Sequence, residues 1–167
     1  MIYILLHAIN TVFPEYPIPF DPQTIYDRLQ HSDLLGIWDV DVIVDHEQIM
    51  NAVAHLRQNL CDIAYPFDGD CYDTSDILRN HYVIHRDLEF LKANRGKMQL
   101  MYNVEGVIGA VGGAIIVRTD KYRFAGMDNE AFYGWGLEDG ERHYRWLGFD
   151  FNIYRSQGIL SAVLYRA

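Results

Sequence analysis

The chain has 167 residues, the length of a single domain, and its 50% hydrophobic and 22% charged residues are typical of a globular protein. Fourteen basic residues against 23 acidic ones give a formal net charge of −9. An acidic chain repels nucleic-acid phosphates unless it carries a basic patch, and the basic residues here are scattered. The composition therefore predicts no nucleic-acid partner.

Neither the N-terminus nor the rest of the sequence carries a recognisable targeting or membrane segment. Met1–Leu6 is apolar, but no basic residue precedes Arg28, so it is a poor signal peptide. The longest uncharged apolar stretch, Gly106–Val117, is shorter than the about 20 residues that span a bilayer. Cys61 and Cys71 lack the spacing of a disulfide scaffold or a metal site. We therefore expect a cytoplasmic protein with no transmembrane segment and two inert thiols.

The hydrophobic pattern predicts strands that alternate with helices. Residues 13–22 contain four prolines and are expected to form an extended loop, because proline disfavours helix at the residue before it. The expected strands are Leu34–Trp38, Ile63–Tyr65, Val111–Val117, Phe149–Tyr154 and Leu160–Tyr165. The expected helices are one that follows the N-cap Asp45, with Gln48 in a capping box, and then Ser75–Leu91, Asp120–Ala125 and Glu138–Leu147. This order predicts an α/β fold with a mixed sheet flanked by helices, in one domain over residues 1–167, of which residues 1–33 are an atypical proline-rich segment.

An acidic pair closes the first of the buried strands after the proline-rich segment. Asp39 and Asp41 are two residues apart, so in an extended chain both carboxylates point the same way and can face one cation. Carboxylates suit Mg²⁺ or Mn²⁺, which take further ligands from water and substrate phosphates. Taken by itself, the pair favours an acidic turn after a strand over a metal site.

A second group of chemically capable residues lies at Phe132–Arg142. Its glycines allow tight turns that present Trp135 in a loop, where an aromatic face can stack on a sugar. Glu138 and Asp139 fall in the first turn of the next helix, where the helix dipole stabilises carboxylates. They are either ordinary first-turn acids or, beside an aromatic platform, candidates for a general base.

The histidines are weaker candidates. His143 lies one helical turn after Asp139 and could touch it, which predicts a surface or supporting partner rather than a metal ligand. His81 and His85 have the i, i+4 spacing of a zinc pair, but no third ligand is near them in sequence.

The order of these motifs resembles the C-terminal half of enzymes with the glycosyltransferase-A fold, above all glycosyltransferase family 2 and the galactosyltransferase C-terminal region. In those enzymes a metal-binding Asp-x-Asp segment comes first, and a Gly-Gly strand then precedes a Gly-Trp-Gly-x-Glu-Asp loop. The resemblance covers about residues 34–160. The residues that carry it are Ile37–Ile43, Tyr65–Gly69, Gly112–Ala114, Ala125–Gly126, Asn129–Glu130 and Tyr133–Arg142.

This resemblance implies an inverting, metal-dependent transfer of a sugar, galactose or an N-acetylhexosamine, from a nucleotide-sugar such as a UDP-sugar to a saccharide hydroxyl. Asp41, with Asp39 beside it, would hold Mn²⁺ or Mg²⁺ against the diphosphate. Asp139 would be the catalytic base and Glu138 would bind acceptor hydroxyls. The expected substrate-binding residues are Gly113, Tyr133, Gly134, Trp135 and Gly136.

The sequence departs from this family in two places. Much of the N-terminal nucleotide-binding half is missing before Asp39, and the C-terminal tail has no histidine as a further metal ligand. The resemblance therefore also allows a partner segment or subunit that binds the donor. Two other hypotheses stay open: a catalytically weak or inactive remnant that binds carbohydrate or a partner chain, and a structural α/β domain with incidental acidic turns.

Overall fold

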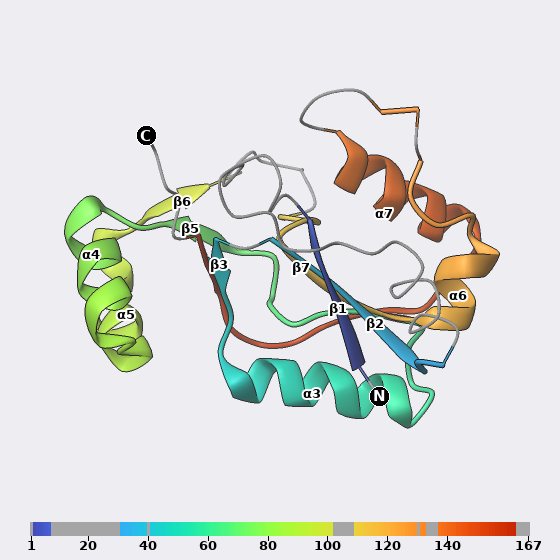
Figure 1. The fold of residues 1–167 in the computed structure, drawn as a ribbon, viewed down its shortest axis with the longest axis horizontal. Coiled ribbons are helices and arrows are strands. Elements are labelled where there is room, and N and C mark those ends of the chain that lie inside the picture. Colours follow the sequence, from blue (N-terminus) through green and yellow to red (C-terminus); the bar gives the residue numbers. More distant parts are fainter. Residues whose placement is uncertain are drawn as a thin grey trace.

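The computed structural model describes residues 2–7, 31–39, 41–101, 109–129, 131–132 and 137–162. Its helices and strands follow one another in a mixed order, which confirms the predicted α/β class (Figure 1). The strands are β1 (Ile2–His7), β2 (Leu34–Asp39), β3 (Val42–Ile43), β4 (Ile63–Tyr65), β5 (Cys71–Asp73), β6 (Gln99–Met101), β7 (Ala114–Arg118), β8 (Ile153–Arg155) and β9 (Leu160–Ala162). The helices are α3 (His46–Arg57), α4 (Asp76–His85), α5 (Leu88–Ala93), a short 3₁₀ helix (Arg95–Lys97), α6 (Thr119–Phe124) and α7 (Glu138–Gly148).

The main sheet has five strands in the order β1-β2-β7-β4-β8. β1 pairs parallel with β2 and β4 pairs parallel with β8, whereas β7 is antiparallel to both of its neighbours. β1, β2, β4 and β8 therefore all run in one direction, and their carboxyl ends meet at the edge of the sheet where β7 begins. A second sheet has the order β3-β9-β5-β6.

Helices cover both faces of the main sheet. Successive strand residues point to opposite faces, so each strand contributes side chains to two apolar layers. On one face Leu34 and Ile116 pack with Val53 and Leu56 of α3. On the other face a larger group, which includes Trp146 of α7, packs under α6 and α7. Figure 1 shows α3 below the sheet, and α6 and α7 beyond its opposite side. The sheet is thus the middle layer of a three-layer arrangement.

The predicted start of α3 is confirmed, but the capping box is wrong. The Asp45 side chain accepts a hydrogen bond from the Glu47 backbone N–H at 3.1 Å. Gln48 is buried, and its amide nitrogen donates to the Pro66 carbonyl at 2.7 Å and the Ile159 carbonyl at 3.2 Å. The side chain ties the helix to distant loops, a use that local spacing could not reveal.

The helix predicted over Ser75–Leu91 is two helices. Arg86 has a left-handed backbone with φ of 54°, which ends α4. Asp87 then caps α5 by accepting from the Phe90 N–H at 2.9 Å. An acid that caps a new helix so soon after a left-handed residue is the local signal that the prediction overlooked.

Two predicted strands begin later than expected. β7 begins at Ala114, after Gly113 with φ of +81°, instead of at Val111. The strand expected from Phe149 begins at Ile153, because Phe149 is the C-cap of α7 and Asp150 follows with φ of 59°. The proline-rich loop at residues 13–22 and the end of the strand predicted to reach Tyr165 lie outside the described residues.

Among the helices of the described residues, none has the length and apolar character that crossing a bilayer requires.

Candidate functional site

The candidate site lies at the edge of the main sheet where the parallel strands end. Asp39 is the last residue of β2 and follows Leu35 and Ile37 at alternate positions, both of which pack on the α6 and α7 side. The Asp39 backbone N–H donates to the Gly113 carbonyl at 2.8 Å. The structure therefore joins two predicted site residues, Asp39 and Gly113, across neighbouring strands.

Asp41 lies in the turn after β2, so it is not the alternate residue of a continuous strand as the spacing predicts. Burial raises the pKa of Asp41, which marks a carboxylate partly removed from water. Burial also raises the pKa of the Cys71 thiol to about 12, and the charges of Asp41, Asp73 and Asp39 raise it further. Both predicted metal ligands are therefore near Cys71 and contribute negative charge to one region.

Two carboxylates can hold a hard cation only if its remaining ligands come from elsewhere. Within the described residues, no group of three His, Cys, Asp or Glu side chains could enclose a metal ion. Mg²⁺ and related ions commonly bind through one or two carboxylates and complete their coordination with water and substrate phosphates. Asp39 and Asp41 match that two-carboxylate pattern.

Asp139, the predicted base, lies in the first turn of α7 against the glycine segment that precedes β7. A Cβ added at Gly112 would overlap Asp139 Oδ2 and lie 2.6 Å from its Cγ. Only glycine leaves room for the carboxylate at this position. Gly112 neighbours Gly113, the residue that bonds Asp39, so one short segment brings the predicted metal ligands and the predicted base to the same sheet edge.

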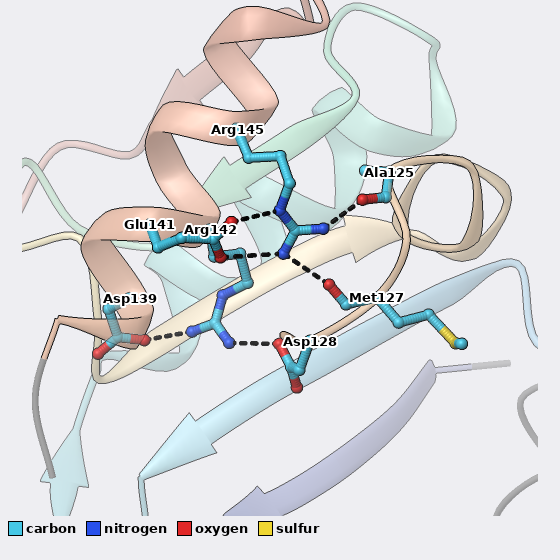
Figure 2. A network of polar contacts seen from close by, with 7 residues as sticks. All are labelled: Ala125, Met127, Asp128, Asp139, Glu141, Arg142 and Arg145. Carbon is cyan, nitrogen blue, oxygen red and sulfur yellow. Dashed lines mark hydrogen bonds and ion pairs between the residues drawn. The ribbon is translucent and has the colours of Figure 1, made fainter. Parts of the chain in front are cut away.

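Arg142 holds the Asp139 side chain in place. Figure 2 shows its guanidinium between two carboxylates: Nη2 contacts Asp139 Oδ1, and Nη1 donates to Asp128 Oδ1 at 2.7 Å. Arg142 is 5% exposed, and while burial lowers its pKa, Asp139 and Asp128 together raise the pKa above its usual range. The arginine is thus a buried cation that fixes one oxygen of Asp139.

A second arginine ties α7 to the segment before it. Arg145 pairs with Glu141 and donates to the backbone carbonyls of Ala125 and Met127 (Figure 2). The contact with Met127 measures 2.7 Å. These bonds anchor the Ala125–Asp128 segment on α7, so that Asp128 can reach Arg142.

His143 is part of the interior and not a surface partner of Asp139. It is 4% exposed, and its Nδ1 shares a hydrogen bond of 2.8 Å with the hydroxyl of Tyr65, the last residue of β4. Burial, with a smaller contribution from Arg155, lowers the pKa of His143. The neutral form of the histidine is therefore favoured, and the side chain packs α7 onto the end of β4.

The other predicted residues have different outcomes. Glu138 is the first residue of α7 and is partly buried. The remaining substrate-binding candidates, Tyr133, Gly134, Trp135 and Gly136, lie outside the described residues.

His81 stacks on Phe90 with ring centroids 3.7 Å apart and lies 4.5 Å from the His85 ring. Cys61 and Cys71 are buried and free.

Sequence reasoning missed three residues that shape this region. Arg142 follows Asp139 by three helical positions, a spacing at which an ion pair is readable from sequence. Gly112 was part of the resemblance, but not assigned to the site. Arg155 follows Tyr65 by 90 positions in the printed sequence, and no local signal connects them.

No protein-family model and no curated protein matches the chain. Solved structures do match. A mutant Drosophila β-1,4-galactosyltransferase 7 in complex with manganese, UDP-Gal and xylobiose is 17% identical, with a TM-score of 0.41 over 79% of this chain and 43% of that one.

Glucosyl-3-phosphoglycerate synthase from Mycobacterium tuberculosis, with Mn²⁺, UDP and phosphoglyceric acid, is 14% identical, with a TM-score of 0.44 over 95% of this chain and 51% of that one. The same enzyme with Mn²⁺, UDP and glucosyl-3-phosphoglycerate is 16% identical, with a TM-score of 0.44 over 95% of this chain and 52% of that one. The chain thus spans about half the length of these solved structures. They are glycosyltransferases, the class of enzyme that the sequence motifs resemble.

Proposed function

We propose that this chain is a metal-dependent, inverting glycosyltransferase that transfers a sugar from a nucleotide-sugar to a saccharide hydroxyl. A UDP-sugar, with galactose or an N-acetylhexosamine, is the proposed donor. One observation carries the proposal: Asp139 lies against Gly112, next to the Gly113 carbonyl that bonds Asp39. Two acidic residues from distant parts of the chain therefore both lie beside one short segment, at the edge where open α/β sheets bind ligands.

Asp41 and Asp39 are the proposed ligands of Mn²⁺ or Mg²⁺, together with the donor diphosphate. When bound, such an ion stabilises the negative charge that develops on the departing nucleoside diphosphate. The partial burial of Asp41 suits this role, because attraction between a carboxylate and a cation strengthens as water is removed.

Asp139 is the proposed base. Arg142 contacts Oδ1 and so orients the carboxylate, while Oδ2 lies against Gly112. Asp139 would accept the proton of the acceptor hydroxyl as the acceptor oxygen forms its bond to the anomeric carbon. The bond from that carbon to the diphosphate oxygen breaks at the same time, and its electron pair leaves with the diphosphate. Attack from the face opposite the leaving group inverts the anomeric configuration.

The remaining proposed roles follow the resemblance. Glu138, beside Asp139 in the same helical turn, would bind acceptor hydroxyls. Trp135 would stack on the sugars, with Gly113, Tyr133, Gly134 and Gly136 shaping the pocket around them.

The first test measures binding and needs no turnover. UDP is titrated by calorimetry into the chain with and without Mn²⁺, using wild type, Asp39→Asn and Asp41→Asn. We expect Mn²⁺-dependent UDP binding that Asp41→Asn weakens more than Asp39→Asn does. Asp76→Asn, at the first position of α4, is the control for loss of a charge and should bind as wild type. Wild-type affinity in Asp41→Asn would show that the metal site is wrongly assigned.

The second test separates the base from a structural acid. Asp139→Asn should retain UDP binding but lower sugar transfer by roughly 10²–10⁴-fold, the usual contribution of a positioned base. Transfer is measured with this chain or, if it needs a donor-binding partner, with the two together. If Glu138→Gln abolishes transfer and Asp139→Asn does not, the base is the neighbouring carboxylate. If neither substitution affects transfer, the proposed mechanism is wrong. If the chain binds saccharides but shows no transfer, it is a carbohydrate-binding module.

A further inference from the structure

Arg155 lies at the same sheet edge as the proposed site and on the same face. It ends β8, where it is the register partner of Tyr65 at the end of β4. Ile153, two residues earlier, packs on the side of the sheet that α6 and α7 cover. Since strand residues alternate, Arg155 shares that face with Tyr65 and, across the sheet, with Asp39.

The guanidinium of Arg155 contacts aromatic rings and one backbone carbonyl. Its Cζ lies 4.3 Å from the centroid of the Tyr65 ring and 5.6 Å from that of Phe67. Nη1 donates to the Ala110 carbonyl at 3.1 Å, whereas Nη2 is buried with no acceptor. In the described part of the chain, no carboxylate lies within ion-pair distance of Arg155. Arg142, the other largely buried arginine at this edge, contacts two.

The absence of an ion-pair partner for Arg155 among the described residues is informative, because the side chain is partly buried. Removing an ion from water without a counter-charge is unfavourable in proteins. Burial accordingly lowers the pKa of Arg155, against smaller opposing contributions from Tyr65 and Asp68. The aromatic rings offset part of this cost, but neither they nor the Ala110 carbonyl accepts a hydrogen bond from Nη2. The side chain keeps some contact with solvent, through which a ligand can approach.

The position of Arg155 indicates which part of a substrate it could meet. Ala110, its carbonyl partner, is two residues before Gly112, so Arg155 and Asp139 flank one short segment. Asp39 on β2 and Arg155 on β8 are three strand steps apart, or about 14 Å at roughly 4.8 Å per step. Asp139 lies between them, because it packs against Gly112 in the segment that precedes β7. A diphosphate held at Asp39 and Asp41 would therefore lie toward the β2 side of this edge, and we assign Arg155, on the β8 side, to the acceptor.

We propose that Arg155 binds an anionic oxygen group of the acceptor, so that the acceptor is a saccharide carrying a phosphate or a carboxylate. The assignment to the acceptor rests on the proposed function, whereas the anion site itself rests only on the surroundings of Arg155. A guanidinium fits either anion, because its N–H groups match two oxygens at once.

The test titrates inorganic phosphate, and separately acetate, into the metal-free chain with a chelator present and ionic strength held constant with chloride. Calorimetry and the shift of the thermal unfolding midpoint report binding. We expect saturable phosphate binding to wild type that Arg155→Gln weakens roughly 10–100-fold, the range for hydrogen bonds to a charged group. Tighter binding of phosphate than of acetate assigns a phosphate-bearing acceptor, and the reverse order a carboxylate-bearing one.

Two further variants keep the result interpretable. Arg155→Lys retains the charge and should bind phosphate with intermediate affinity, even if Arg155→Gln does not fold. Arg95→Gln removes an arginine that stacks on Tyr72 at 4.7 Å but is paired with Asp70, so it should bind phosphate as wild type does. The proposal is overturned if wild type shows no saturable binding of either anion, or if Arg155→Lys and Arg155→Gln both bind like wild type.

This outcome is independent of the test of the proposed function. Loss of Mn²⁺-dependent UDP binding in Asp41→Asn concerns the donor side, and that variant should still bind phosphate in the chelator. If phosphate instead competes with Mn²⁺ and UDP in wild type, the anion site belongs to the donor and the acceptor assignment is wrong. If the glycosyltransferase proposal fails while Arg155-dependent binding persists, the chain has an anion site with another purpose.

Discussion

The two faces of the main sheet differ in what they bury. Between the sheet and α3, the core cluster consists of apolar side chains, among them Leu34, Val53, Leu56 and Ile116. On the other face, the apolar cluster under α6 and α7 is joined at the carboxyl edge by Tyr65, Arg142, His143 and Arg155. The same strands therefore support a largely apolar layer on one side and a mixed layer on the other.

This difference shows where the fold can support chemistry. On the α7 face, several buried polar groups have specific partners: Tyr65 has His143, and Arg142 has Asp128 and Asp139. Such pairs hold side chains in one geometry, which an apolar contact does not do. We infer that the α3 face chiefly stabilises the fold, while the α7 face positions carboxylates at the sheet edge.

The largest expected effect on stability comes from the apolar face. Leu56 is 1% exposed, and Leu56→Ala should lower the free energy of unfolding by about 2–5 kcal/mol, because it removes buried surface and leaves a cavity. Urea unfolding measures this loss. Below the unfolding transition, the affinity for UDP in the presence of Mn²⁺ should match wild type. A folded Leu56→Ala protein with altered UDP affinity would break the proposed division between the faces.

A smaller loss of stability, with a loss of function, is expected at Gly112. In Gly112→Ala the new methyl group overlaps the Asp139 carboxylate, so that Asp139 must move and its contact with Arg142 is disturbed. Overpacking of this kind lowers the free energy of unfolding by about 1–3 kcal/mol. Sugar transfer by the folded variant should fall as well, because the Asp139 carboxylate is displaced. Urea unfolding and a transfer assay on the same preparation check this.

Gly140→Ala is the matched control, because Gly140 is in the same helix as Asp139 and nothing lies within 4 Å of a Cβ placed there. It should leave transfer unchanged and raise stability by up to about 1 kcal/mol, as a helix favours alanine over glycine. Equal behaviour of the two alanine variants would contradict the role given to the Gly112 contact.

The smallest expected effect is a dependence of stability on pH. Burial lowers the pKa of His143 in the folded chain below the ordinary value of 6.5, so the unfolded chain binds more protons near that pH. The stabilising contribution of neutral His143 is therefore full above pH 6.5 and is lost as the pH falls below it. Unfolding free energies at pH values on both sides of 6.5 should decline less steeply in His143→Gln. An equally steep decline in both proteins would place the proton uptake elsewhere.

Local patterns in the sequence were sufficient for most of the elements near the site. β2, β4 and α7 were predicted within a residue or two, because short apolar runs and helical spacing depend on neighbouring residues. Asp45 as an N-cap and the acids at the start of α7 are likewise local. The order of these motifs was sufficient to indicate the resemblance and to select Asp39, Asp41 and Asp139.

Only the tertiary structure decided how those residues meet. Three contacts join segments far apart in sequence: the pairing of β1 with β2, the stacking of Arg155 on Tyr65, and the packing of Asp139 against Gly112. The polar side chain of Gln48 was misassigned for the same reason, since its partners are in distant loops. The spacing of nearby residues determines the local backbone, whereas strand pairing and packing determine which distant side chains share one edge of the sheet.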